Sequence, residues 1–413
     1  MNNQPKRGIR SSLCCELLFL MLVSARFFDL IPLQPVLAGG GVLFLLLGTL
    51  AVIYMTQLGF QLRMGILKHM KAVWWILSGV LLSFAAAYLF YGQGLFTSLV
   101  VCRNYLTLLV FPLLLAVRPT YREIRRTLYT FCWICAATTL YVTFINQSLV
   151  PTAENMPFIE DGDFVHMVSG LHFVVIAFIF SLYEFRNKMT VRKFLPVMLL
   201  FAFIFIARNR TFLIASCFII VLSVVSTRSQ RSKVYAYGIV AVAVAMVFVL
   251  AYSALISLLD ETMDQLNNPD YNRIKSFIYF FSIPNGPLSI FIGNGFISGT
   301  VNPLVGDLQK EGIFYSDLGL IGLWHVYGLI PPLVILANVF KGLSPNHSLE
   351  VRGNALLILM CSFTVGYFAT VETLTWLCFY LYFLHSDKSY SEAVARYRKK
   401  MQQMILRRYR SIR

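Results

Sequence analysis

Charged side chains are scarce in this sequence, and acidic ones are the scarcest. Asp, Glu, Lys and Arg make up 13% of the 413 residues, and Asp and Glu together number 19. An ordinary soluble domain has about a quarter of its residues charged. The apolar runs extend from residue 13 to residue 385 with no long polar block between them. The sequence therefore argues against two or three soluble domains and predicts one membrane domain over residues 1–386.

Recognisable cysteine and targeting patterns are also missing. The eight cysteines lie in or beside apolar runs, so they define no disulfide framework. Cys132 and Cys135 form a C-x-x-C without a second pair, and we expect neither a metal nor a redox role for them. The basic residues ahead of the first apolar run are not followed by a clear small-residue cleavage site, so this run is predicted to be a retained helix.

What the sequence does contain is a series of long apolar runs. A membrane-spanning helix needs about 20 mostly apolar residues, and about twelve runs meet that need. The seventh and the last are short, so eleven spans or a re-entrant segment are alternatives. The predicted spans are 13–31, 36–56, 73–91, 98–117, 127–146, 164–183, 194–208, 211–227, 234–254, 315–340, 354–371 and 373–386. The predicted fold is an all-α polytopic membrane protein.

The positive charge is distributed between these runs. The net charge is +16, but Lys and Arg do not gather on one soluble face, so we expect no nucleic-acid partner. Cytoplasmic loops of membrane proteins are rich in Lys and Arg. With the N-terminus in the cytoplasm, most of the 35 Lys and Arg fall on the cytoplasmic side and most acids on the outer side. Both termini are therefore predicted to be cytoplasmic.

Two outer connections and the C-terminal tail are long enough to have structure. The connection 147–163 is acidic, and the connection 255–314, between the ninth and tenth spans, is rich in turn residues. A loop of that length is usually functional. The basic tail 387–413 has apolar residues at near-helical spacing, which suggests a helix on the anionic inner leaflet. A solvated tail is the alternative.

A few arginines do not fit the cytoplasmic pattern. Arg103, Arg208 and Arg210 are predicted to lie near one depth at the outer side. An ionisable group in a spanning region costs about 2.5 kcal/mol or more, so it persists mainly where a polar cavity or a partner compensates. Arginine holds phosphate oxygens in bidentate fashion, so the cluster suits a lipid diphosphate. Pairing with acids such as Asp161 or Glu372, or snorkelling, is the alternative.

The residues around Arg210 resemble a known family. The stretch Ala207–Leu213 opens an apolar helix and resembles the helix start of O-antigen polymerases and O-antigen ligases, with Arg210 on the family's arginine. Further similar motifs follow in the family's order: Arg273 in Tyr271–Ile274, Gly293-Asn294-Gly295, Asp317–Gly322 and Tyr327-Gly328. The resemblance covers about a third of the chain, residues 206–340.

The resemblance implies a GT-C-like glycosyltransferase in the bacterial plasma membrane. Such an enzyme transfers glycan at the outer face from an undecaprenyl-diphosphate-linked oligosaccharide, without a metal, a nucleotide sugar or another cofactor. Its partners are the lipid bilayer that surrounds it and, in some members of the family, a chain-length regulator. Ligases carry a His-Asn pair shortly before the acid that corresponds to Asp317, and here the sequence is Asp307-Leu308-Gln309. A polymerase (Wzy-type) of O-antigen, capsule or exopolysaccharide is therefore favoured over a ligase.

The expected roles follow from this chemistry. Arg208, Arg210, Arg273 and Arg103 are predicted to hold the diphosphate, with Arg210 and Arg273 stabilising the leaving group. The base for the acceptor hydroxyl is predicted to be His166 or Asp317, and His172 is an alternative. Tyr271, Tyr315 and Glu372 are predicted to bind glycan. Each has a structural alternative: a hydrogen-bonded histidine, a helix cap at Asp317, an arginine partner for Glu372, and an aromatic belt for the tyrosines.

Two other classes of protein remain open from the sequence. Outer arginines in a cavity would also serve a flippase of lipid-linked glycans, which should have cavity charges at both membrane depths and related halves. A membrane-anchored assembly protein without chemistry should tolerate Arg210→Ala, whereas the enzyme should not.

Overall fold

The computed structural model describes most of the chain. The described residues are 10–27, 41–57, 69–144, 158–161, 164–167, 170–207, 209–226, 272–281, 285–298, 308, 311, 313–363 and 368–387; at 142–144, 158–161, 164–167, 272–273 and 316–317 only the backbone is described. The predicted span 234–254 and, apart from Asp387, the basic tail lie outside these residues.

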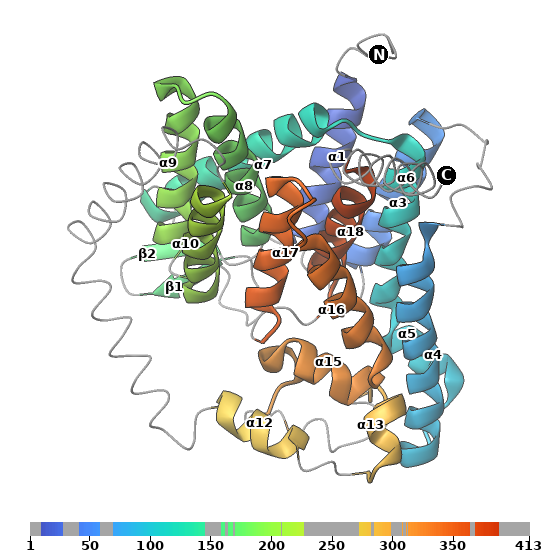
Figure 1. Ribbon diagram of the computed structural model, residues 1–413. Helices are drawn as coiled ribbons and strands as arrows, with labels where there is room; N and C mark the ends of the chain where they lie inside the picture. Colours follow the sequence, from blue (N-terminus) through green and yellow to red (C-terminus); the bar gives the residue numbers. More distant parts are fainter. Residues whose placement is uncertain are drawn as a thin grey trace, which may run out of the picture.

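The predicted all-helical class is confirmed for the described residues (Figure 1). The α-helices are α1 (Ser11–Ser24), α3 (Gly41–Gln57), α4 (Lys71–Tyr91), α5 (Leu95–Val101), α6 (Val110–Val117), α7 (Tyr121–Phe144), α8 (Leu171–Asn187), α9 (Val191–Ile206), α10 (Arg210–Val225), α12 (Asn272–Phe281), α13 (Leu288–Ile292), α15 (Leu320–Tyr327), α16 (Ile330–Gly342), α17 (Leu349–Cys361) and α18 (Val371–Ser386). Two 3-10 helices, η3 (Arg103–Leu109) and η5 (Tyr315–Leu318), and one hairpin, β1 (Phe158–Asp161) with β2 (Phe164–Met167), complete the described elements.

The core lies around α8 and α18. Residues 171–182 of α8 and 374–384 of α18 are buried without a break, so neither helix has a solvent face. A helix that is apolar on all sides is a central helix. α7, α9, α10 and α17 pack around α8, while η3, α6 and α17 pack against α18.

One end of the bundle, uppermost in Figure 1, carries most of the basic side chains of the described helices, and we call it the basic end. Contacts there join α1 to α7 (Arg10 with Glu123), α8 to α7 and α9 (Glu184 with Arg125 and Lys193), α8 to α10 (Arg186 with Ser226) and α17 to the end of α18 (His347 with Asp387). The opposite end, which we call the distal end, contains the starts of α8, α10 and α18 and the short helices α12, α13 and α15 (Figure 1).

The predicted span 98–117 is not one straight helix, because the chain bends by 58° between α5 and the η3–α6 segment. Pro112 has no N–H and its ring excludes the carbonyl of Leu108 from regular α-helical geometry. Residues 103–109 wind as a 3-10 helix, and the thiol of Cys378 contacts the carbonyl oxygens of Thr107 and Leu108 at 3.7 and 4.0 Å.

Two further predicted spans differ from the structure. The span 315–340 is divided at Gly328, whose φ of 75° ends α15, and α16 then begins with Pro331 and Pro332 in its first turn. The predicted span 164–183 begins as strand β2, and α8 starts only at Leu171. Phe164 and Val165 favour extended backbone, and β2 pairs antiparallel with β1, placing His166 opposite Ile159.

Few of the described helices are long enough to cross a bilayer alone. α4, with 21 residues and a mean hydropathy of 1.9, meets the requirement, and the bent pair of α5 with η3–α6 would be a second span. α1, α3, α10 and α16 are apolar but shorter. The predicted twelve spans are therefore not established by helix length.

Candidate functional site

The first turns of α8, α10 and α18 meet at the distal end around Trp376. The His172 ring, in α8, stacks on Trp376 with ring centroids 5.4 Å apart and planes 24° apart. Phe212, in the first turn of α10, lies 6.5 Å from the same indole ring. The backbone N–H of Gly170 donates to Oε1 of Glu372, in the first turn of α18, at 2.7 Å. Three helix starts, with their partial positive charges, are therefore close together.

Local sequence determines where each of these helices begins. Asn209 caps α10, because its side chain accepts from the N–H of Phe212 at 3.2 Å. Thr370 and Thr373 form a reciprocal capping box at the start of α18. Gly170 precedes α8 with a φ of 77°, a conformation that glycine adopts without steric cost. Polar caps and one glycine thus fix the end of each helix at the site.

His172 and Glu372 form the centre of this site. Nδ1 of His172 lies 3.0 Å from Oε1 of Glu372, and the exposed fractions of the two side chains are 3% and 24%. A neutral imidazole that donates from Nδ1 keeps a lone pair on Nε2. Nε2 of His172 is buried and has no hydrogen-bond partner among the described residues, and the same holds for Nε1 of Trp376. Two buried nitrogen atoms at this site therefore have unmet hydrogen bonds among the described residues.

Arg103 and Arg210 lie at the edge of this site. Arg210 is the first residue of α10. Arg103 begins η3, and its two following residues bind the turn before α18: Asn104 Nδ2 donates to the carbonyl of Ala369 at 3.3 Å, and the Tyr105 hydroxyl donates to that of Phe368 at 3.1 Å. Both guanidinium groups are partly exposed. The structure thus places both arginines at helix ends that contact α18 or the turn before it.

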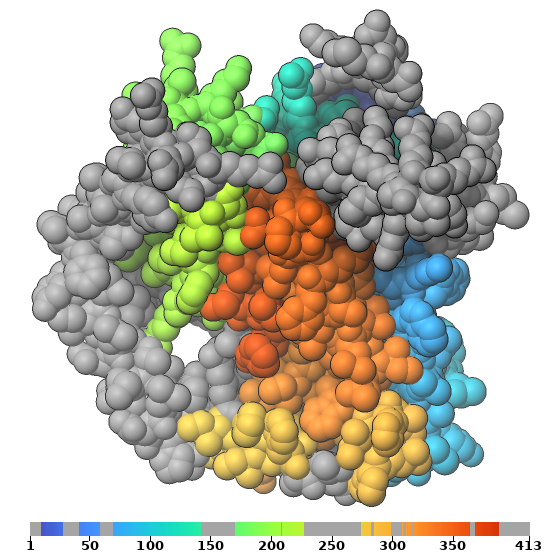
Figure 2. Space-filling view, viewed as in Figure 1, coloured from blue at the N-terminus to red at the C-terminus, as the bar shows by residue number. Residues whose placement is uncertain are grey.

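The remaining predicted site residues are elsewhere or are not described. Arg208 and Tyr271 lie outside the described residues. The backbone places Arg273 in α12, Asp317 in η5 and His166 in β2. α12 packs against η5 and α15. Figure 2 shows α12, in gold, at the lower edge of the molecule, below the yellow-green end of α10.

A second polar cluster at the distal end surrounds His325. Asn285 Nδ2 donates to the Tyr91 hydroxyl and to Oδ1 of Asn294, both at 2.7 Å, and Asn294 Nδ2 donates to the carbonyl of His325 at 3.0 Å. The Tyr315 ring stacks on His325 with centroids 5.9 Å apart. A small pocket here is lined by Phe280, Ser289, Ile290, Asn294, Trp324 and His325. Asn294 lines this pocket and Asn285 holds its side chain; neither was predicted as a site residue from the sequence.

The glycine motifs have a packing role in this cluster. The N–H groups of Asn294 and Gly295 donate to the carbonyls of His325 and Val326 at 2.8 and 2.9 Å. A Cβ at Gly293 would lie 2.3 Å from the carbonyl oxygen of Val326, and one at Gly322 would lie 1.9 Å from that of Tyr315. Glycine is therefore required at Gly293 and Gly322 because two backbone segments approach each other closely.

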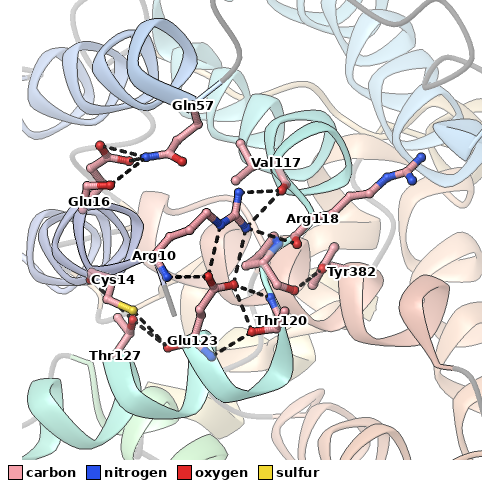
Figure 3. Close-up of polar contacts among 12 residues, drawn as sticks. Arg10, Cys14, Glu16, Gln57, Val117, Arg118, Thr120, Glu123, Thr127 and Tyr382 are labelled. Atoms are coloured by element: carbon pink, nitrogen blue, oxygen red, sulfur yellow. Dashed lines mark hydrogen bonds and ion pairs between the residues drawn. The ribbon is translucent and has the colours of Figure 1, made fainter. Parts of the chain in front are cut away.

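The basic end has its own buried polar groups. The Arg10 guanidinium donates to Glu123 and to the carbonyls of Val117 and Arg118, while Thr120 donates to Glu123 from its N–H and hydroxyl (Figure 3). These hydrogen bonds satisfy backbone carbonyl groups at the end of α6 and a backbone N–H group before the start of α7, as a capping box does. We interpret it as a structural clamp that joins α1 to the α6–α7 turn.

The start of α17 contributes a second buried group at the basic end. His347 Nδ1 lies 2.9 Å from Oδ2 of Asp387. Burial raises the pKa of the neighbouring Glu350 to about 7. Oδ1 of Asn354, one turn further along α17, is buried without a hydrogen-bond partner among the described residues.

No group of three or more His, Cys, Asp or Glu within the described ranges is arranged to hold a metal ion. Cys132 and Cys135 are both buried with free thiols. No protein-family model, curated protein or solved structure matches this chain.

Proposed function

We propose that this protein is a membrane-embedded glycosyltransferase that polymerises undecaprenyl-diphosphate-linked oligosaccharides at the outer face of the bacterial plasma membrane. The observation that supports this most is the meeting of three helix starts with Arg103, Arg210 and the His172–Glu372 pair at one end of the bundle. Positive helix ends and guanidinium groups suit a diphosphate, and an imidazole held by a carboxylate suits a hydroxyl acceptor.

Membrane embedding is supported by the apolar side chains that the helices expose. α4 exposes Trp74, Trp75, Leu81, Leu82, Tyr88 and Leu89 along its length. α10 exposes a stripe of Ile214, Phe218, Val221 and Val225. Monomeric soluble proteins rarely expose large contiguous apolar patches, so we assign these faces to lipid.

The charge of the basic end indicates how the protein is oriented in that membrane. Arg118, Arg122 and Arg126 are exposed there, and Lys and Arg concentrate on the cytoplasmic side of membrane proteins. The distal end then faces outward, where a lipid diphosphate with its glycan would be presented. Both termini are cytoplasmic in this arrangement.

In the proposed reaction the bond between the sugar and the diphosphate breaks as the acceptor hydroxyl attacks. Negative charge develops on the leaving diphosphate, and cations that are already positioned stabilise that charge without reorganising. Arg210 and Arg103 are assigned to this task, together with Arg208 and Arg273 from the sequence resemblance. The Asp307-Leu308-Gln309 sequence, without the ligase histidine, favours the polymerase over the ligase.

The test is complementation of a deletion strain. Arg210→Lys keeps the charge but loses the planar fork, and we expect long-chain polymer to fall by about 100-fold while single repeat units still reach the cell surface. Arg122→Lys, an arginine exposed at the basic end, is the matched control and should give wild-type chain lengths. If Arg210→Lys and Arg210→Ala both give wild-type polymer at equal protein level, the proposal that this protein is a polymerase is refuted.

A carrier of lipid-linked glycans is the second candidate, because buried polar groups also occur at the basic end. Glu350, with its pKa raised to about 7 by burial, and Asn354 lie in α17, which packs against both α8 and α10. The deletion strain separates the two functions. Loss of a polymerase leaves single repeat units on the surface, whereas loss of a carrier leaves the lipid-linked units on the cytoplasmic leaflet.

A further inference from the structure

We propose that His172, oriented by Glu372, is the base that takes the proton from the acceptor hydroxyl. This rests on the proposed function and deepens it, because it assigns the acceptor side of the same site. The sequence favoured His166 or Asp317 for this role with His172 as the alternative, and the geometry points to His172.

The ring of His172 is fixed on three sides. Glu372 binds Nδ1 at 3.0 Å, Trp376 stacks on one ring face, and Phe173 lies with its centroid 4.1 Å from that of the imidazole. A base whose orientation is fixed by a carboxylate presents its other nitrogen in one direction. The orientation of Nε2 of His172 is therefore set by the protein before a substrate binds.

The same nitrogen has an unmet hydrogen bond. A buried polar atom without a partner costs about 1–3 kcal/mol, so each such atom calls for an explanation. Nε2 of His172 and Nε1 of the stacked Trp376 are both buried without partners among the described residues. An acceptor hydroxyl that donates to His172, and a ligand oxygen that accepts from Trp376, would satisfy both atoms at once.

The two bases that the sequence favoured are described by their backbone alone. His166 lies in the hairpin β1–β2, and Asp317 lies in η5. The other histidine of the distal end, His325, is bounded by the Asn294 amide and by the rings of Phe280 and Tyr315.

His347 supplies a matched comparison. Its Nδ1 lies 2.9 Å from a carboxylate oxygen of Asp387, so it has the same type of pair as His172, but it is buried at the basic end. Chemistry on a diphosphate at the distal end should depend on His172 and not on His347. The two histidines therefore separate a catalytic role from the general cost of disturbing a buried His–carboxylate pair.

In the proposed step one bond forms, one bond breaks and one proton is transferred. The acceptor oxygen forms a bond to the anomeric carbon as the bond from that carbon to the diphosphate oxygen breaks, and the electron pair leaves with the lipid diphosphate. The hydroxyl proton moves to Nε2 of His172, and Glu372 stabilises the resulting imidazolium. The proton then passes to water and restores the neutral ring.

The experiment compares His172→Gln, Glu372→Gln, Glu372→Asp and His347→Gln in purified protein. Binding is measured with undecaprenyl diphosphate by native mass spectrometry. Turnover is measured as product ladders from the lipid-linked glycan extracted from the deletion strain. We expect the His172→Gln rate to fall by at least about 100-fold with undecaprenyl diphosphate affinity within about threefold of wild type. Glu372→Gln should lower kcat with little change in KM, Glu372→Asp should restore part of the rate, and His347→Gln should stay within about threefold of wild type.

Each contrary result has a definite meaning. A wild-type rate in His172→Gln, or equal losses of rate and of undecaprenyl diphosphate affinity in that variant, would overturn the assignment of the base while the polymerase proposal stands. Equal rate losses in His172→Gln and His347→Gln would likewise overturn it. If wild-type protein binds undecaprenyl diphosphate but forms no ladder, the proposed function fails, and this inference fails with it.

Discussion

Glu123 is a buried carboxylate that keeps its charge. Its side chain is 1% exposed and receives hydrogen bonds from Arg10 and from the N–H and hydroxyl of Thr120. Burial by itself raises the pKa of Glu123, but these hydrogen bonds outweigh it and lower the pKa from 4.5 to about 2. The ionised form is therefore the one that the fold stabilises.

The first prediction concerns acid stability. Because the pKa of Glu123 is lower in the folded protein than in the unfolded chain, its contribution is complete above about pH 4.5 and is lost as the pH falls toward 2. Glu123→Gln should lower the free energy of unfolding by about 3 kcal/mol at neutral pH. In this variant Tm should also fall less steeply than in wild type as the pH is lowered from 4.5 toward 2. Glu16→Gln, whose carboxylate binds Thr56 and Gln57 near the surface, is the control and should change stability by less than about 1 kcal/mol. Acid branches of equal slope in wild type and Glu123→Gln would contradict this account.

The second prediction separates two reasons for glycine. Gly293 and Gly286 have nearly the same φ, 78° and 77°, but of the two only Gly293 has other backbone atoms within reach of an added Cβ. Gly286→Ala should cost about 1 kcal/mol from backbone strain alone. Gly293→Ala should cost clearly more, because Val326 and Gly328 would have to move. Thermal unfolding of the two variants measures the difference, and equal Tm values would show that close packing is unimportant there.

At the scale of elements, close contact between helices also depends on single residues. A Cβ on Gly79 of α4 would lie 2.5 Å from the Pro331 ring of α16, whereas a Cβ on Gly48 of α3 would meet nothing within 4 Å. α4 therefore approaches α16 closely at Gly79.

The third prediction follows from this contact. Gly79→Leu should lower stability by about 2 kcal/mol through overpacking, and Gly48→Leu should be close to neutral. The fraction of protein that stays monodisperse in detergent on heating measures the effect. If Gly48→Leu is the more damaging variant, the packing of α4 on α16 is not as described.

The ends of elements decide where the candidate site lies. Asn209, Thr370 and Gly170 stop three helices from extending further at the distal end, and the 3-10 segment η3 places Arg103 next to the turn before α18. The arginines and the His172–Glu372 pair thus share a location through caps and a helix break rather than through one sequence motif.

At the scale of the whole molecule, orientation can be measured directly. Leu288 in α13 is 52% exposed at the distal end, and Arg122 is exposed at the basic end. We expect a membrane-impermeant maleimide to label Leu288→Cys in intact cells and Arg122→Cys only after permeabilisation, with the native cysteines replaced. Labelling with the opposite pattern would reverse the proposed orientation and remove the outer diphosphate site.

The helix that begins at Arg210 was expected to begin one residue later, at 211. The site roles of Arg103 and Glu372 stay predictions. The helical setting of His166 was wrong and the bend within 98–117 was not expected, because hydropathy does not distinguish an α-helix from a bent 3-10 segment or a strand of the same composition. The pairing partner of His172 could not be read from the chain.

The sequence by itself determined the helical class and the positions of the basic clusters along the chain. These depend on composition and on residues close in the chain, through hydrophobic periodicity, helix caps and backbone conformation. Only the tertiary structure decided that Gly170 and His172 meet Glu372, because 202 residues separate Gly170 from Glu372 and packing alone brings them together. Local patterns hold no information about such a pair, whose position is set by how α8 and α18 pack in the core.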